Sequence, residues 1–205
     1  MTETELRMTD HELLALLSMT PTESAATTLA LFRLGQHGDN ELLKNAGITT
    51  LMVRGLAELQ GDRIVPVDRC AVVGKVLSQA QEWLEISLTT PSTKHVLFTA
   101  GSNAGAVLLS LSPVGVHDIQ PIESGSAMLA LGLHLCSEYL AGAAEGLPAT
   151  AVVKRLRVDQ EPVVAQLTAV ESGDWTLRSG DESEFAEETV SPDVALDRFE
   201  AVLSA

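Results

Sequence analysis

Residues 83–120 of this chain, WLEISLTTPSTKHVLFTAGSNAGAVLLSLSPVGVHDIQ, decide its fold class. From Trp83 onward, apolar and polar residues alternate, and this period of two predicts strands at 83–89, 95–100, 106–111 and 116–120. The links between them are short and rich in turn-forming residues: Thr90-Pro-Ser-Thr93, Gly101-Ser-Asn-Ala-Gly105 and Ser112-Pro-Val-Gly115. Such links favour an antiparallel meander over parallel crossovers.

The second half of the chain repeats this plan. A helix is expected from about Ser124 to Ala141, followed by strands at 150–158, 163–170 and 175–178, one further candidate strand at 185–190, and a helix at 192–203. Ser191-Pro-Asp193 predicts the start of that last helix, because it supplies a cap, a proline at the first helical position and an acid in the first turn. The helix is expected to bury Ala195, Phe199, Val202 and Leu203. We expect 96–135 and 163–203 to form a pseudo-twofold repeat; the alternative is two α+β segments that merely look alike.

The first 68 residues predict helices closed by a small hairpin. Thr22 is expected to cap a helix at 23–34, with an inward face of Ala26, Leu29, Ala30 and Leu34. Asn40 is expected to cap a short helix ending near Gly47, and another helix is expected at 50–60 before a hairpin strand at 63–67. Asp68 then caps a helix to about Glu82, whose buried stripe is Val72, Val73, Val76, Leu77 and Ala80.

The expected fold is therefore α+β, with antiparallel sheet units and flanking helices. Its parts are a winged-helix-like segment at 1–68, a first α/β half at 69–146 and a second α/β half at 147–205, within one compact domain. In a winged helix, 50–60 would be the recognition helix and 61–67 the wing. Arg54 and Arg63 are the only cations there and are opposed by acids, whereas a DNA reader needs several cations.

The chain is acidic, with a formal net charge of −15, and most of the excess lies in residues 158–205. Such a chain repels phosphate backbones, so no nucleic-acid partner is expected. The start lacks the form of a signal peptide, and the apolar run 126–136 is interrupted by His134 and followed by Glu138. We therefore expect a cytoplasmic protein without a membrane partner. Cys70 and Cys136 are expected to be buried free thiols, with a disulfide as the alternative.

No catalytic, cofactor-binding or metal-binding motif is recognisable. The serine of 101–105 stands one place too early for a nucleophile elbow, and Gly74-Lys75 lacks the rest of a phosphate loop. His134 and Cys136 are two residues apart, which on a helix points them about 200° from each other. His117 and Asp118 are neighbours on a strand and face opposite sides, so they cannot form a catalytic dyad directly. We expect a protein that is not an enzyme and holds no cofactor or metal.

Several segments together resemble one protein family. Leu51-Met-Val-Arg-Gly-Leu-Ala-Glu-Leu59 and Gly61-Asp-Arg-Ile-Val-Pro-Val67 are similar to the opening of the EspG-like chaperones of actinobacterial type VII secretion. The strands at 96–101 and 106–112 resemble that family's meander, and Ile119-Gln-Pro-Ile122 with the helix at 124–141 resembles its next strand and helix. The resemblance covers about 45–203. It implies a quasi-twofold pair of half-sheets and a cytosolic chaperone that shields the apolar tip of a secreted helical-hairpin dimer.

We therefore expect a non-enzymatic protein-binding adaptor or chaperone. Its partner would be a small helical secreted protein or a second copy of the chain. The loop 101–105 and the helix 124–141 are the expected contact region, with the partner-binding residues Ser102, Asn103, Met128, Leu131 and Leu135. A helix apolar on nearly every side is usually buried, so core packing is the competing interpretation of 124–141. The alternative function is a winged-helix-type transcriptional regulator or a dimerisation module.

Overall fold

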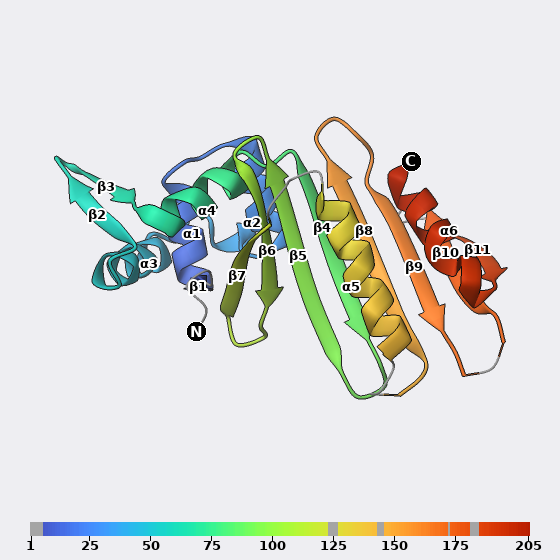
Figure 1. Ribbon diagram of the computed structural model, residues 1–205. Helices are drawn as coiled ribbons and strands as arrows, with labels where there is room; N and C mark the ends of the chain where they lie inside the picture. The colour runs from blue at the N-terminus through green and yellow to red at the C-terminus, as the bar shows by residue number, and fades with distance from the viewer. Residues whose placement is uncertain (1–5, 123–126, 143–145, 172, 181–184) are drawn as a thin grey trace. The chain divides into compact units, whose positions relative to one another are not determined.

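The computed structural model describes residues 6–122, 127–142, 146–171, 173–180 and 185–205 and has an α+β fold (Figure 1), as expected. Its helices are α1 (Asp10–Ser18), α2 (Glu23–Leu31), the short 3-10 helix η1 (Gly35–His37), α3 (Glu41–Val53), α4 (Asp68–Ser78), α5 (Met128–Gly142) and α6 (Pro192–Ser204). A small hairpin consists of β2 (Ala57–Gln60) and β3 (Arg63–Pro66). The remaining strands are β1 (Leu6–Thr9), β4 (Glu82–Thr89), β5 (Lys94–Ser102), β6 (Gly105–Leu111), β7 (Val116–Ile122), β8 (Ala149–Arg157), β9 (Val163–Ala169), β10 (Trp175–Gly180) and β11 (Phe185–Val190).

Within the described residues, these nine strands form one sheet in the order β1-β7-β6-β5-β4-β8-β9-β10-β11. The predicted meander is confirmed, because β4 to β7 follow one another in both sequence and sheet order. The predicted repeat is confirmed as an order of elements: β4-β5-β6-β7-α5 is followed by β8-β9-β10-β11-α6. The helices depart from the repeat, since α5 packs on β4 and β8 whereas α6 packs on β9 and β10. The expected start of α5 at Ser124 lies outside the described residues, as does position 172 in the expected turn before β10.

Contacts divide the chain into two compact units: Met1–Gln81 with Ala100–Gly125, and Glu82–Thr99 with Ser126–Ala205. In the first unit, β1 pairs antiparallel with β7, with Leu6 opposite Ile119. The strand β1 was not predicted. It leads directly into α1, where the Thr9 side chain accepts from the Glu12 backbone and the Glu12 side chain accepts from the Thr9 backbone, a complete capping box.

The predicted break at Gly47 is wrong, as is the helix at 50–60. One helix, α3, runs from Glu41 to Val53, and 57–60 is strand β2. Gly47 permits a close contact with α1: a Cβ atom there would lie 1.9 Å from the His11 carbonyl oxygen. Gly47 therefore serves the packing of α3 against α1 and does not end a helix. The expected recognition helix at 50–60 is not formed, because its residues belong to the end of α3 and to β2.

The buried faces of α2 and α4 also differ from the prediction. Thr22 caps α2 as expected, but the buried residues of this helix are Ala25 and Thr28. Thr28 can be buried because its hydroxyl donates a hydrogen bond to the Leu77 carbonyl at 3.1 Å. Ala26 and Ala30 are exposed and Leu29 is half-buried. In α4, Val67 rather than Asp68 is the cap residue, and the helix ends at Ser78 instead of near Glu82. Val72 is 55% exposed, whereas Val73, Val76 and Leu77 are buried as predicted, as is Ala80 beyond the end of the helix.

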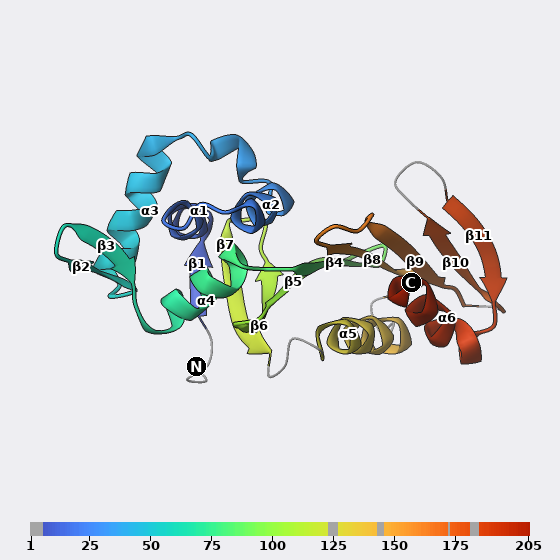
Figure 2. The same cartoon turned by 90° about the horizontal axis from the view of Figure 1, so that it is seen from above.

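In the second unit, α5 and α6 lie on the same side of the strands (Figure 2). Gly132 brings α5 close to the sheet, since a Cβ atom there would lie 3.1 Å from Ile86 Cδ1 and 3.2 Å from Leu84 Cδ1. The helix α6 begins at Ser191-Pro-Asp193 as predicted and buries Ala195, Phe199 and Leu203, while Val202 is half-buried.

Five threonines form one row on the other face of this sheet. Thr89, Thr150, Thr168, Thr176 and Thr189 are successive cross-strand partners on β4, β8, β9, β10 and β11. The hydroxyl groups of Thr150 and Thr168 lie 3.1 Å apart. β-branched side chains favour the extended backbone, and cross-strand pairs of them stabilise the pairing of neighbouring strands. The row therefore stabilises the strand pairing on the face that the two helices leave uncovered.

Candidate functional site

The first unit contains an apolar groove. Its volume is about 630 Å³. It lies between α4 and the strands β1, β6 and β7, and is called the α4 groove here. The residues that line it are Leu6, Asp68, Arg69, Val72, Val73, Val76, Ala104, Gly105, Ala106, Val107, Ile119, Pro121 and Ile122.

The chemistry of the α4 groove suits apolar side chains with one polar end. Its walls are aliphatic, and Asp68 and Arg69 at the start of α4 are the charged groups among the described residues that line it. Val72 is exposed at the groove, so a partner can remove its side chain from water. A predominantly apolar concavity with a few polar groups at its border is the usual form of a binding site.

The predicted contact loop borders this groove. Ala104 and Gly105, which follow Ser102 and Asn103, belong to its lining. The Ser102 hydroxyl accepts a hydrogen bond from the Ala104 backbone at 3.0 Å, which shapes the turn, and Asn103 is exposed. The loop that the sequence indicated thus lies next to the groove, and the contact of Ser102 and Asn103 with a partner stays a prediction.

The predicted contact residues of α5 lie in the second unit and are less accessible. Met128 is 1% exposed, so its side chain offers no surface to a partner without rearrangement. Leu131 and Leu135 are half-buried. The buried face of the helix is Met128, Gly132, Cys136 and Leu140, which matches the competing interpretation of this helix as a core element.

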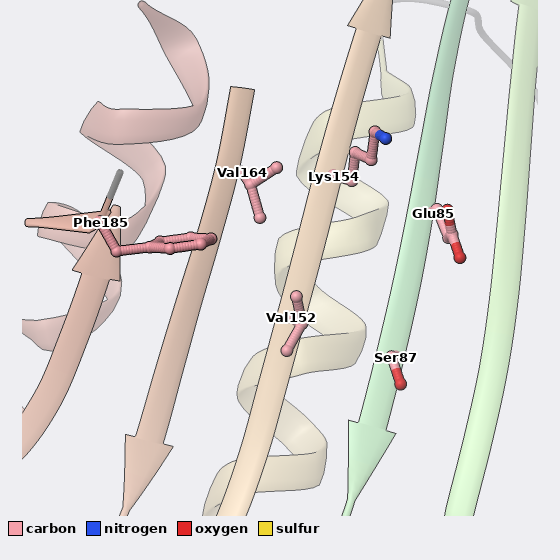
Figure 3. A pocket seen from close by; sticks show the side chains of 6 residues that line it. All are labelled: Glu85, Ser87, Val152, Lys154, Val164 and Phe185. Carbon is pink, nitrogen blue, oxygen red and sulfur yellow. The ribbon is translucent and has the colours of Figure 1, made fainter. Parts of the chain in front are cut away.

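A second, smaller concavity of about 270 Å³ lies on the open face of the sheet in the second unit. Figure 3 shows its lining side chains on the side of the strands away from α5: Glu85, Ser87, Val152, Lys154, Val164 and Phe185. Glu85 and Lys154 are cross-strand partners, and Phe185 is exposed on β11. This depression is smaller than the α4 groove and mixes charged with apolar groups, so it is the weaker candidate.

His117 acts as a bridge between secondary-structure elements. Its Nε2 atom lies 2.8 Å from Asp10 Oδ1, and its Nδ1 atom accepts the Ser112 backbone N–H at 3.2 Å. Asp118 instead accepts from Arg7 at 2.8 Å, so the two neighbours point apart as predicted. Both ring nitrogens of His117 are occupied, and the ring joins β7 to the first turn of α1.

Neither cysteine is suited to nucleophilic chemistry. Cys70 and Cys136 are buried free thiols, as predicted. Burial raises the pKa of each thiol to about 12, so the reactive thiolate is scarce at neutral pH. Within the ranges that the structure describes, His, Cys, Asp and Glu side chains form no group of three or more that could hold a metal ion.

Val72 is a surface residue that the sequence pattern did not predict. All three valines of 72–76 were expected in one buried stripe, although Val72 and Val73 are adjacent on a helix and point about 100° apart. Helical geometry alone therefore contained the signal that one of the two faces outward.

No model of a known protein family and no curated protein matches this chain in sequence. Among solved structures, the chain is similar to the Mycobacterium tuberculosis type VII secretion system chaperone EspG5, solved in complex with the PE25-PPE41 dimer. The TM-score is 0.54 and the identity is 12%, and the match covers 98% of this chain and 96% of that one. The similarity concerns the fold, and at that level it supports the resemblance expected from the sequence.

Proposed function

We propose that this chain is a protein-binding adaptor or chaperone that performs no turnover and holds a small helical protein. The α4 groove is the observation that carries the proposal, because its aliphatic walls and the exposed side chain of Val72 form a concave apolar surface that suits a protein partner. The fold similarity to a chaperone solved with a PE25-PPE41 dimer supports the same reading.

The partner in this proposal is a secreted helical protein kept soluble before export, in the manner of type VII secretion. An amphipathic helix places its apolar side chains in a groove at positions i, i+3, i+4 and i+7. The aliphatic walls of the α4 groove would receive them, while Asp68 and Arg69 would orient polar groups at one end. We place the protein in the cytoplasm. None of the helices in the described ranges combines the length and hydropathy of a bilayer span.

A DNA-reading role is not favoured by the residues that would perform it. Arg54, the cation expected on the recognition helix, donates to both carboxylate oxygens of Glu12 and to the Arg7 carbonyl. Residues 57–60 form strand β2 instead of the end of a helix. Arg54 is therefore engaged within the protein rather than presented to phosphates.

The test is affinity purification of the tagged chain from its native host, followed by mass spectrometry and reconstitution with the purified partner. We expect a small helical protein at a near-equimolar ratio. Val72→Glu should weaken its binding by about tenfold or more, because it places a charge in the aliphatic wall. Val194→Glu is the matched control, since Val194 is also an exposed helical valine but belongs to α6.

Two results would overturn the proposal. One is purification of the chain with no near-equimolar helical partner. The other is a reconstituted complex whose dissociation constant is the same for Val72→Glu, Val194→Glu and the parent chain, which would separate binding from the α4 groove.

A further inference from the structure

The strand β11 is the outermost strand of the sheet in the second unit. Among the described residues it pairs with β10 and has no strand on its other side, as Figure 2 shows. Five of its six residues, Phe185 to Thr189, are exposed, and Val190 is buried. The backbone N–H and C=O groups along its outer edge are therefore open to a further strand.

The edge of β11 lacks most of the features that usually block strand addition. Folded proteins commonly close an edge with a proline, a β-bulge, a covering helix or a charge. The segment Phe185–Val190 contains no proline, and all its residues pair with β10 in unbroken register, without a bulge. The helix α6 packs on β9 and β10, and the exposure of β11 shows that this strand is left uncovered. Charge is the remaining protection, and Glu187 and Glu188 provide it.

The strand β1 at the other end of the sheet is protected differently. It has four residues, and its Arg7 carbonyl accepts a hydrogen bond from the Arg54 side chain at 2.7 Å. The Arg7 side chain forms an ion pair with Asp118 at 2.8 Å. One backbone acceptor of β1 is therefore already used by a side chain, whereas no such bond exists at β11 within the described ranges.

The charge at β11 is local and of one sign. Residues 181–188, DESEFAEE, hold five acids and no basic residue. Arg178 on β10 pairs with Glu187 at 2.9 Å, but these side chains are 46% and 57% exposed, so water screens the pair. Successive residues of a strand point to opposite faces, so Glu187 and Glu188 place one carboxylate on each face of the sheet beside the open edge.

We propose that β11 binds an extended segment of a partner protein, which joins the sheet as a further strand and carries two adjacent basic residues. The backbone of β11 supplies the hydrogen bonds, and its side chains select the sequence that is bound. Two adjacent basic residues also point to opposite faces, so they meet Glu187 and Glu188 as cross-strand pairs. β-branched residues on either side of them suit the neighbours Phe185 and Thr189. The inference goes beyond the proposed function, because it assigns a second binding surface, in the other unit and for a strand instead of a helix.

A second copy of the chain is a poor occupant of this edge. Full-length antiparallel pairing of two β11 strands about a twofold axis places Glu187 of each strand directly opposite Glu188 of the other. Like charges in directly opposite positions destabilise a strand pair. The β1 strand of a second copy offers four residues, with one carbonyl already bound to Arg54. The two glutamates therefore disfavour self-association and favour a basic strand.

The probe is a labelled synthetic peptide of about nine residues, with a central Lys-Arg pair between valine and threonine residues, measured by fluorescence anisotropy against the full chain. We expect it to bind. At saturation it should slow amide hydrogen exchange, followed by NMR, by about tenfold or more at alternate residues of β11, because every second N–H of a strand faces outward. Glu187→Gln with Glu188→Gln should weaken binding by about fivefold or more.

The controls separate strand addition from general attraction by charge. Glu138→Gln with Glu161→Gln removes the same charge from exposed positions on α5 and in the β8–β9 link, and should leave peptide binding nearly unchanged. A peptide with Glu-Glu in place of the Lys-Arg pair should not bind. A peptide that is N-methylated at its central amides keeps its charge but cannot donate ladder hydrogen bonds, and should bind at least about tenfold more weakly.

The inference falls if the Lys-Arg peptide does not bind, or if its N-methylated form binds equally well, because charge alone then accounts for the attraction. It also falls if the Glu138 and Glu161 control loses as much binding as the β11 variant, with circular dichroism showing both folded. Slowed exchange that spares the β11 amides would place the peptide elsewhere on the protein. A dimer in sedimentation whose β11 amides are protected without peptide would make a second copy the occupant.

Discussion

Replacement of Arg54 by alanine tests the ion pair that holds α3 to α1. Arg54 Nη1 lies 2.8 and 2.7 Å from the two carboxylate oxygens of Glu12, and Nη2 donates to the Arg7 carbonyl at 2.7 Å. The Glu12 side chain is 0% exposed and that of Arg54 is 38% exposed. Without Arg54, the hydrogen bonds that the buried carboxylate keeps within the described ranges are those from the backbone and hydroxyl of Thr9.

Removal of one partner from a buried ion pair costs about 3 to 5 kcal/mol. Arg54 is partly exposed, so water can enter the space that it leaves, and we expect a loss of about 3 kcal/mol in the free energy of unfolding. Urea unfolding followed by far-ultraviolet circular dichroism measures this loss. Glu12→Gln should restore part of the stability of Arg54→Ala, because a neutral amide is less costly to bury than a carboxylate.

The control is Arg178→Gln, which breaks the exposed pair of Arg178 and Glu187. Exposed pairs contribute about 0 to 1 kcal/mol. The reasoning is refuted if Arg54→Ala loses no more stability than Arg178→Gln, or if Glu12→Gln fails to stabilise the Arg54→Ala background.

Three further predictions concern packing and thiol chemistry. Gly47→Ala should destabilise the protein by about 1 to 3 kcal/mol, because the new Cβ atom meets the backbone of α1. Gly142→Ala is the control and should be neutral or slightly stabilising, because a Cβ atom there meets nothing within 4 Å. The urea midpoints of the two variants measure the difference. Cys70 and Cys136 should resist a thiol reagent at pH 8 in the folded protein and react quickly in denaturant. The reason is that burial raises the pKa of both thiols to about 12. Equal labelling rates in the folded and denatured states would contradict this prediction. Phe199→Ala should cost about 3 to 5 kcal/mol in the free energy of unfolding, because Phe199 is fully buried between α6 and the sheet, and a loss below 1 kcal/mol would contradict the packing.

The sequence predicted those parts of the fold that depend on local signals. Period-two alternation and the turn residues between 90 and 115 located β4 to β7 within two residues. Ser191-Pro-Asp193 located the start of α6, where the cap, the proline and the first-turn acid all act within one helical turn. These features are independent of distant contacts, so they can be recognised without knowledge of the rest of the chain.

Features that depend on distant contacts were not predicted. The four residues of β1 become a strand because they pair with β7, more than a hundred positions later, and nothing local distinguishes them. Gly47 was interpreted as a helix end because glycine commonly ends helices. Its actual role depends on the position of His11 across the helix interface.

The candidate site shows the same division. The loop containing Ser102 and Asn103 was selected from the sequence and borders the α4 groove. The groove itself was not predicted, because it depends on the packing of α4 against β6, a contact between distant parts of the chain. An exposed apolar row on α3, formed by Leu42, Ala46, Thr49 and Val53, was hidden by the predicted break at Gly47. With a continuous helix, its spacing is visible in the sequence.

The pairing of β4 with β8 has a consequence for the order of folding. Their ladder joins Thr89 to Thr150, so it closes a loop of about 60 residues. During synthesis from the N-terminus, β4 can pair with the following β5 well before β8 has left the ribosome. The backbone N–H and C=O groups of its other edge then remain unpaired for that interval. Leu84 and Ile86, which α5 covers in the folded protein, are uncovered at the same stage, so the nascent chain offers an apolar strand to aggregation that the folded protein does not.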